Sequence, residues 1–153
     1  LPARSADIEA YLLDTFTVNS GRLQVFGETQ WTAPVASGSG APDAMVVCPC
    51  TTGTLSAIAC GGCDNLIERA ADVMLKEQKK LILVTREMPL SAIHLENMLK
   101  LARLGCVMMP ASPGFYQKPE GISDLIDFVV ARILDQLQID QQLMPPWGEQ
   151  HDG

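Results

Sequence analysis

The chain has 153 residues, of which 47% are hydrophobic, and its formal net charge is −7. This length and apolar content suit one sizeable core, so we expect a single domain over residues 1–153. The acidic balance argues against nucleic acid as a partner. We expect no membrane span, because no apolar run approaches roughly 20 residues, and no signal peptide, because a basic start followed by an apolar core is absent.

The first predicted element is a short amphipathic helix over residues 5–16, which Ser5 would cap. Residues 23–26 are typical of a short strand, and residues 27–43 are rich in Gly, Ser and Pro and predict a loop. The continuous apolar run over 44–48 is typical of a buried parallel strand.

The rest of the chain alternates helices with strands. We expect a helix from Asn65, a strand over 81–84, a helix from Ser91 to about 104, a strand over 106–109, and a helix over 122–137, followed by a polar tail over 138–153. This alternation predicts an α/β fold, a Rossmann-like or flavodoxin-like parallel sheet with flanking helices. Right-handed crossovers would place the loops after the strands at one edge of the sheet.

Two segments that follow predicted strands are candidates for binding. Arg86 and Glu87 come after the strand at 81–84, where open α/β sheets bind ligands; a buried Arg–Glu pair that holds a turn is the alternative. The turn Thr51-Thr52-Gly53-Thr54 presents hydroxyl and N–H groups at a helix start, which suits an anion. An ordinary capped helix would look the same, and the P-loop signature is absent.

Five cysteines, an odd number, predict reduced thiols in a cytoplasmic protein. The pairs Cys48-Pro-Cys50 and Cys60-Gly-Gly-Cys63 could supply four thiolates to zinc. Because the first pair ends a buried strand and the second follows an apolar helical turn, we favour buried thiols and expect no metal.

Other residues have both a structural and a functional interpretation. Trp31, Tyr116 and Trp147 lie in predicted loops or in the tail and are candidates for lining a flat apolar pocket. Arg132 lies among apolar residues of the last helix, where a cation needs a partner or an anionic ligand. His94 is favoured as a helix-packing residue over a catalytic one.

The chain resembles the UbiX/Pad-type flavin prenyltransferases, within the superfamily of homo-oligomeric flavin-containing cysteine decarboxylases. The most specific matching stretches are AADVMLKE and REMPLSAIHLENM, supported by ASGSGAPDAMVVCPCTTGTLSAIA, PASPGFYQKP and DFVVARILDQL. The resemblance implies a metal-independent transferase that joins a dimethylallyl group from dimethylallyl phosphate to N5 and C6 of reduced FMN. It also implies a homo-dodecamer whose product serves a UbiD-type decarboxylase, typically in ubiquinone biosynthesis.

The resemblance also assigns roles to residues. It implies that flavin is bound by Thr51, Thr52, Gly53, Thr54 and Arg86, and that Glu87 transfers a proton. It implies that the dimethylallyl phosphate is held by Lys76, Tyr116, Arg132, Ser37 and Gly38, with Trp31 and Trp147 flanking the prenyl group. Cations on the leaving group suit ionisation of an allylic phosphate without a metal.

The sequence departs from the family at its start. Members begin with a strand, a Gly-Ala-Ser-Gly loop that binds the flavin phosphate, a helix and a second strand. We therefore expect that the first βαβ unit is missing, as in an N-terminal truncation, and that this chain alone binds FMN poorly. A flavin-dependent cysteine decarboxylase, which would lack the set Lys76, Tyr116 and Arg132, and a non-catalytic oligomer-forming subunit are the alternatives.

Overall fold

A three-stranded parallel sheet forms the centre of the protein. The computed structural model describes residues 4–19 and 21–144. The sheet order is β1-β2-β3, with β1 at Ala44–Cys50, β2 at Lys80–Thr85 and β3 at Val107–Pro110. Val47 pairs with Leu83, and Leu83 pairs with Met108. The parallel α/β sheet predicted from the apolar runs is thereby confirmed.

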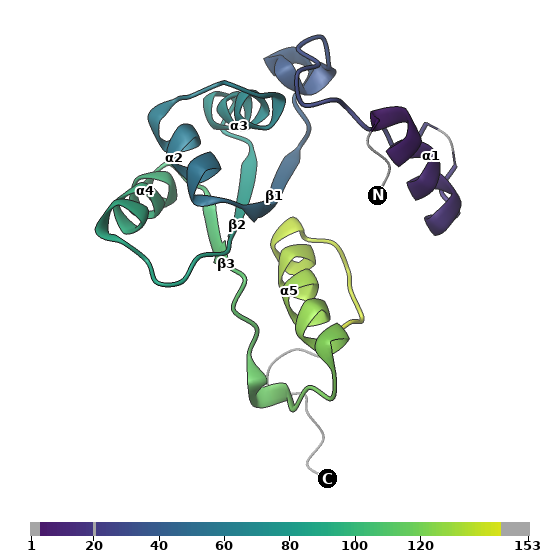
Figure 1. Cartoon of the computed structure of the whole chain (residues 1–153), viewed down its shortest axis with the longest axis vertical. Helices are drawn as coiled ribbons and strands as arrows, with labels where there is room; N and C mark the ends of the chain where they lie inside the picture. Colours follow the sequence, from purple (N-terminus) through teal and green to yellow (C-terminus); the bar gives the residue numbers. More distant parts are fainter. Residues whose placement is uncertain (1–3, 20, 145–153) are drawn as a thin grey trace.

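Three helices cover one face of this sheet: α2 (Thr52–Cys60), α3 (Leu66–Lys76) and α4 (Ala92–Arg103) (Figure 1). Alternate residues of the strands face these helices, since side chains alternate between the two faces of a sheet. The core therefore joins strand residues such as Leu81 and Leu83 to Leu55 of α2, Met74 of α3 and Leu101 of α4, all fully buried.

Polar caps fix where these helices begin. The side chains of Thr51, Asn65 and Ser91 each accept a hydrogen bond from the backbone N–H three residues later, which satisfies a donor that has no partner inside the helix. His94 completes a capping box, because its Nδ1 accepts the Ser91 N–H at 3.3 Å. His94 is thus a capping residue in the first turn of α4.

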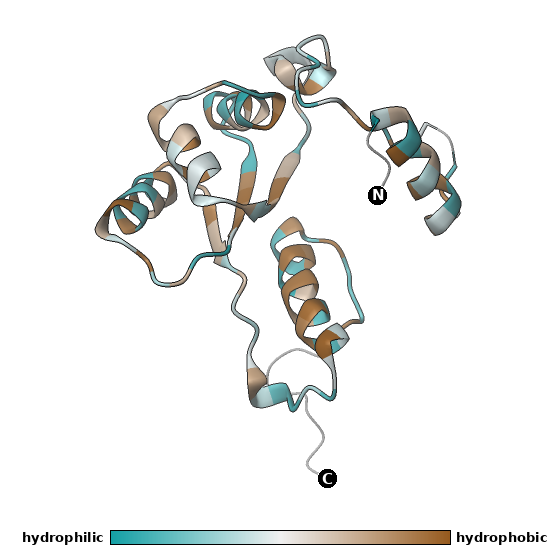
Figure 2. Cartoon of the chain, in the orientation of Figure 1, coloured by the Kyte–Doolittle hydropathy of each residue, from teal (hydrophilic) through white to brown (hydrophobic). Residues whose placement is uncertain are grey.

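The first and last helices lie apart from this core (Figure 1). No residue of α1 (Ser5–Phe16) is buried, and Ala131 is the single buried residue of α5 (Ile122–Leu137). Lys80, the first residue of β2, donates a hydrogen bond from Nζ to the carbonyl of Gln136 near the end of α5. Figure 2 shows that apolar residues run along much of α5, so this helix presents an apolar surface that the described residues leave uncovered.

Two local predictions were wrong. Residues 23–26 form no strand; the Val25 N–H instead donates to the carboxylate of Glu9 at 2.8 Å, so a side chain of α1 replaces the partner strand. The residue before α1 is Arg4, without a side-chain cap, and Ser5 is already helical. The helix bounds at 5–16 and 122–137 are confirmed, and no helix among the described residues is long and apolar enough to cross a membrane.

Candidate functional site

A cavity of about 460 Å³ opens at the carboxyl ends of β2 and β3. The two strand ends are held together there, since the Ala111 N–H donates to the Thr85 carbonyl at 2.8 Å. The cavity is lined by Thr85, Arg86, Glu87, Met88, Leu90, Met98, Pro110, Ala111 and Ser112. Arg86 and Glu87 therefore border an open space at the sheet edge where α/β proteins bind ligands.

Arg86 is the basic residue of this cavity, and it is exposed. Its guanidinium makes no hydrogen bond or ion pair with any residue in the described ranges. Glu87 is also exposed, and its Oε1 accepts the N–H of its neighbour Met88 at 3.1 Å. An anion can thus reach Arg86 without displacing a protein carboxylate, and Oε2 of Glu87 is left to accept a proton.

The threonine turn at the start of α2 lies at the same edge, because it directly follows β1. The Thr51 hydroxyl oxygen accepts the Thr54 N–H at 3.2 Å, and the two hydroxyl groups are 3.0 Å apart. Thr51 and Gly53 are exposed, while Thr52 and Thr54 are half-buried. The turn therefore caps α2 and also presents the positive end of that helix at the carboxyl edge.

Lys76, Ser37 and Gly38 lie at the opposite edge of the sheet. Lys76 is the last residue of α3, just before β2 begins, and its Nζ is 2.5 Å from Oε1 of Glu77. A Cβ added to Gly38 would overlap that carboxylate oxygen and would lie 2.8 Å from the Lys76 Nζ. The structure thus brings three of the predicted phosphate-binding residues together, at the amino edge.

Arg69 belongs to the same group, although it was not among the residues predicted from the sequence. Its Nε donates to the Ala36 carbonyl at 3.0 Å, and its Nη1 lies 3.0 Å from Oδ2 of Asp72. Arg69 precedes Lys76 on α3 by two helical turns, a spacing that puts both cations on one side of the helix. This spacing of seven residues from Lys76 is the feature of the sequence that could have identified Arg69. Arg69 holds the loop that carries Ser37 and Gly38 against α3.

Tyr116 and Arg132 form a third group, on the short 3₁₀ turn η3 (Phe115–Gln117) and on α5. The Tyr116 ring contacts Phe128 edge-on, with 5.9 Å between ring centroids. Phe128 lies one helical turn before Arg132, whose Nη1 is 2.7 Å from Oδ2 of Asp135. Phe128 therefore links the two predicted residues along α5.

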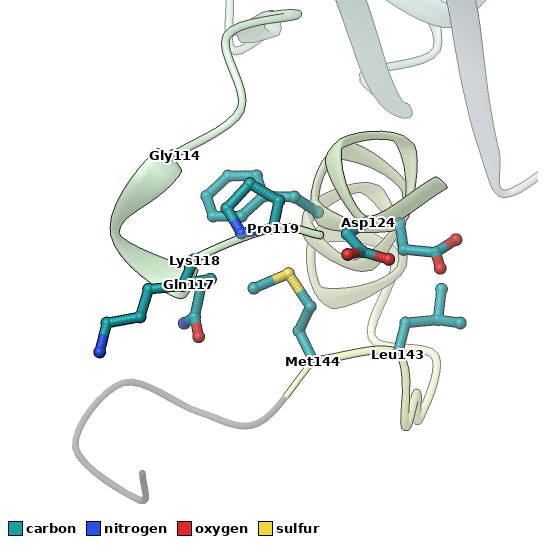
Figure 3. A pocket seen from close by; sticks show the side chains of 9 residues that line it. Gly114, Gln117, Lys118, Pro119, Asp124, Leu143 and Met144 are labelled. Carbon is teal, nitrogen blue, oxygen red and sulfur yellow. The ribbon is translucent and has the colours of Figure 1, made fainter. Parts of the chain in front are cut away.

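A second cavity, of about 200 Å³, lies between η3, α5 and the segment that follows α5 (Figure 3). It is lined by Gly114, Gln117, Lys118, Pro119, Asp124, Asp127, Phe128, Leu143 and Met144. The carboxylate of Asp124 accepts the N–H groups of Glu120 and Gly121, and these bonds lower the pKa of its carboxyl group. Asp124 is thus engaged in capping α5, and Asp127 is the carboxylate that remains for a ligand.

The predicted site residues do not converge within one copy of the chain. Arg86, Glu87 and the threonine turn occupy the carboxyl edge, Lys76 with Ser37 and Gly38 the amino edge, and Tyr116 with Arg132 the α5 region. Trp31 is exposed in the loop between α1 and β1. Trp147 lies outside the described residues.

The cysteines are free thiols, as the odd count predicts. Cys50 and Cys106 are buried, and burial raises the pKa of the Cys50 thiol to about 11. The prediction of buried thiols was wrong for Cys48 and Cys60, which are exposed; Cys48 lies where β1 leaves its register with β2. Among the described residues no cluster of three or more His, Cys, Asp or Glu could hold a metal ion.

Comparisons with known proteins identify the family of the chain. The family model named Flavoprotein matches residues 6–134. Flavin prenyltransferase UbiX of Pseudomonas aeruginosa is 60% identical over 151 residues, which cover 99% of this chain and 72% of that protein. The UbiX enzyme of Halalkalibacterium halodurans is 51% identical over 139 residues, covering 91% of this chain and 68% of its own length.

Two solved structures extend the comparison. The crystal structure of AnUbiX (PadA1) in complex with FMN and dimethylallyl pyrophosphate matches with a TM-score of 0.79 and 50% identity, covering 81% of this chain and 66% of that one. The dodecameric FMN-dependent UbiX-like decarboxylase of Escherichia coli O157:H7 also has a TM-score of 0.79, with 43% identity over 90% of this chain and 77% of that one.

Proposed function

The chain belongs to the flavoprotein family and, within it, to the UbiX-type flavin prenyltransferases; on this basis we propose that it transfers a dimethylallyl group from dimethylallyl phosphate to reduced FMN. The observation that carries the proposal is the identity with the Pseudomonas enzyme over nearly the whole chain. The product, prenylated FMN, would then serve a UbiD-type decarboxylase.

The residues at the carboxyl edge fit a flavin. An exposed helix start with two threonine hydroxyls borders this edge, as does a guanidinium that has no partner among the described residues. Both suit the polar and anionic parts of FMN. We assign FMN to Thr51, Thr52, Gly53, Thr54 and Arg86. Reduced FMN would supply the nucleophilic ring atoms that receive the allyl group.

The cations suit a reaction without a metal. An allylic phosphate leaves more easily when fixed positive charges neutralise the departing phosphate. We assign that role to Lys76, Arg86 and Arg132, with Tyr116, Ser37 and Gly38 as further phosphate contacts. Trp31 and Trp147 would flank the prenyl group, where indole faces stabilise allylic positive charge.

Glu87 is the proposed proton acceptor. It lies at the rim of the carboxyl-edge cavity beside Arg86, with Oε1 engaged by the Met88 N–H. Its second oxygen, Oε2, would take the proton that the acceptor ring releases. The carboxylate thus completes the reaction after the phosphate has been stabilised by the cations.

We propose that several copies of the chain build each site. This accounts for the positions of Lys76 and Arg86 at opposite edges of the sheet. Ile122 and Ile126, on one side of α5, are 77% and 57% exposed, which suits an interface between copies. The Escherichia coli relative is dodecameric, and we propose a dodecamer here as well.

Two finer proposals concern the cellular setting. We propose that the prenylated flavin serves ubiquinone biosynthesis and that the protein works in the cytoplasm. Five free thiols support a reducing compartment.

The test is product formation by this chain. Because this chain is expected to bind FMN poorly, it is incubated anaerobically with dimethylallyl phosphate and with reduced FMN at a saturating concentration, and the flavin is analysed by mass spectrometry. We expect the mass of FMN plus one dimethylallyl group, and unmodified FMN when the donor is left out. Unmodified flavin in the complete reaction would contradict the proposal.

A further inference from the structure

Glu77 lies at the amino edge of the sheet, beside Lys76 and against Gly38. Three of the basic side chains at this end of the chain's core are paired with carboxylates: Arg69 with Asp72 at 3.0 Å, Lys76 with Glu77 at 2.5 Å, and Lys79 with Asp43 at 3.0 Å. Lys80, at the start of β2, donates to the carbonyl of Gln136 instead. Arg69 reaches the loop that carries Gly38 through the Ala36 carbonyl, whereas both members of the Lys76–Glu77 pair lie directly against Gly38.

Gly38 shows how close this contact is. The position of a Cβ on Gly38 is already taken by the carboxylate of Glu77, and the Lys76 Nζ lies 2.8 Å from the same point. The ammonium and the carboxylate therefore share one side of the Gly38 backbone. The hydrogen bond and the charge of Lys76 also hold the pKa of the Glu77 carboxyl below its usual range, so the carboxylate is ionised at neutral pH.

We propose that Glu77 is a specificity-determining residue that limits how much negative charge the amino edge accepts, and that it favours a monophosphate over a diphosphate donor. Its carboxylate competes with the donor phosphate for Lys76 and repels further negative charge beside Gly38. This inference rests on the proposed function, in which Lys76, Ser37 and Gly38 hold the phosphate of the allylic donor.

Charge explains the preference. Coulomb repulsion grows with the product of the two charges, and a diphosphate carries more negative charge than a monophosphate. Lys76 and Glu77 are partly exposed, with side-chain exposures of 48% and 38%, so water weakens both their attraction and the repulsion of a ligand. We therefore expect a change of about 2- to 5-fold for a monophosphate, the size of one exposed ion pair, and about 5- to 20-fold for a diphosphate.

The experiment compares Glu77→Gln with Asp43→Asn. Both variants remove one negative charge at the same end of the core, but Asp43 pairs with Lys79. Binding of inorganic phosphate and of pyrophosphate is measured by calorimetry for the wild-type chain and both variants. We expect Glu77→Gln to bind both anions more tightly, with the larger gain for pyrophosphate, and Asp43→Asn to keep the wild-type ratio.

Several results would overturn the inference. Weaker binding of both anions by Glu77→Gln would mean that Glu77 orders Lys76 for the ligand. An equal shift in Asp43→Asn would mean that the change in affinity comes from net charge and not from the position of Glu77. If no form of the chain bound either anion measurably, the amino edge would not be an anion site. Circular dichroism checks that each variant is folded.

A parallel product assay separates this inference from the proposed function. The wild-type chain and Glu77→Gln are given reduced FMN with either dimethylallyl phosphate or dimethylallyl diphosphate. If the wild-type chain prenylates FMN and the variant keeps the same donor preference, the inference about Glu77 is contradicted while the proposed function stands. If the wild-type chain makes no product from either donor, the proposed function fails, and the anion-binding ratio still decides the role of Glu77.

Discussion

The two edges of the central sheet carry cations in opposite states. At the carboxyl edge, Arg86 borders a cavity of about 460 Å³ and has no carboxylate partner among the described residues. At the amino edge, Arg69 and Lys76 are each paired with an acidic neighbour. The carboxyl edge is therefore ready to bind an anion, whereas an anion at the amino edge must compete with a carboxylate that the chain supplies.

The difference follows from how the chain builds each edge. The loop between β2 and α4 is short and exposed, so Arg86 meets few side chains. At the amino edge the end of α3 packs against the turns at 34–40, and this packing concentrates charged groups. Lys76 also lies in the last turn of α3, where the helix dipole favours a cation. A binding edge and a charge-balanced edge thus arise at the two ends of the same strand, β2.

The largest expected effect concerns the chemistry at the carboxyl edge. Glu87→Gln keeps the shape of the side chain but removes the proton acceptor, so kcat should fall by about 10²- to 10⁴-fold. The affinity for dimethylallyl phosphate should change little, as measured by calorimetry. Glu96→Gln, an equal charge change at an exposed position of α4, serves as the control. Loss of binding with kcat intact would contradict the assigned role.

The next experiment asks whether the two edges act in one site. Arg86→Met and Lys76→Met should each weaken binding of the donor by about 10- to 100-fold, because each removes a charged hydrogen bond. When the two weakened variants are unfolded together, mixed and refolded, roughly a quarter of the sites should regain both cations, and with them wild-type donor binding, if each site draws its edges from different copies. Absence of recovery, with mixed oligomers shown by native mass spectrometry, would mean that the edges serve separate sites.

A smaller effect is expected in the α5 region. A Cβ on Gly114 would overlap the Tyr116 ring and would lie 3.2 Å from Phe128, so Gly114→Ala should displace Tyr116 and cost about 1–3 kcal/mol of stability. The KM for the donor should rise while kcat changes less. Gly27→Ala is the matched control, since its nearest atom would be 3.5 Å away. Equal effects in both variants would contradict the proposal that Tyr116 contacts the donor phosphate.

The smallest expected effect concerns the threonine turn. Thr51→Val removes the oxygen that accepts the Thr54 N–H, which should lower the free energy of unfolding by about 0.5–2 kcal/mol. Thr51→Ser keeps the acceptor and should restore the wild-type Tm. If both variants lose FMN affinity equally while Tm is unchanged, the turn contributes through its shape and not through the cap.

The sequence predicted the elements of the fold because their signals are local. Continuous apolar runs identified β1, β2 and β3, and polar residues at helix starts identified the beginnings of α2, α3 and α4. The prediction of a strand at 23–26 was wrong for a related reason. The pattern suits a strand, but a strand also needs a neighbouring strand, and here the carboxylate of Glu9 accepts the Val25 N–H instead. Local pattern cannot show whether a partner strand is present.

For the candidate site, the sequence by itself determined the residue types and their place relative to each strand: Arg86 and Glu87 after β2, Thr51 after β1, and Lys76 before β2. Only the tertiary structure decided which of them meet. The contacts of Gly38 with Glu77, of Ala36 with Arg69 and of Asp43 with Lys79 join residues more than thirty positions apart. Such contacts depend on how the loop before β1 packs against α3, and side-chain packing between distant segments leaves no periodic signal in the chain. That Lys76 is paired, and that Arg86 has no partner in the part of the chain that the structure describes, are therefore properties of the fold.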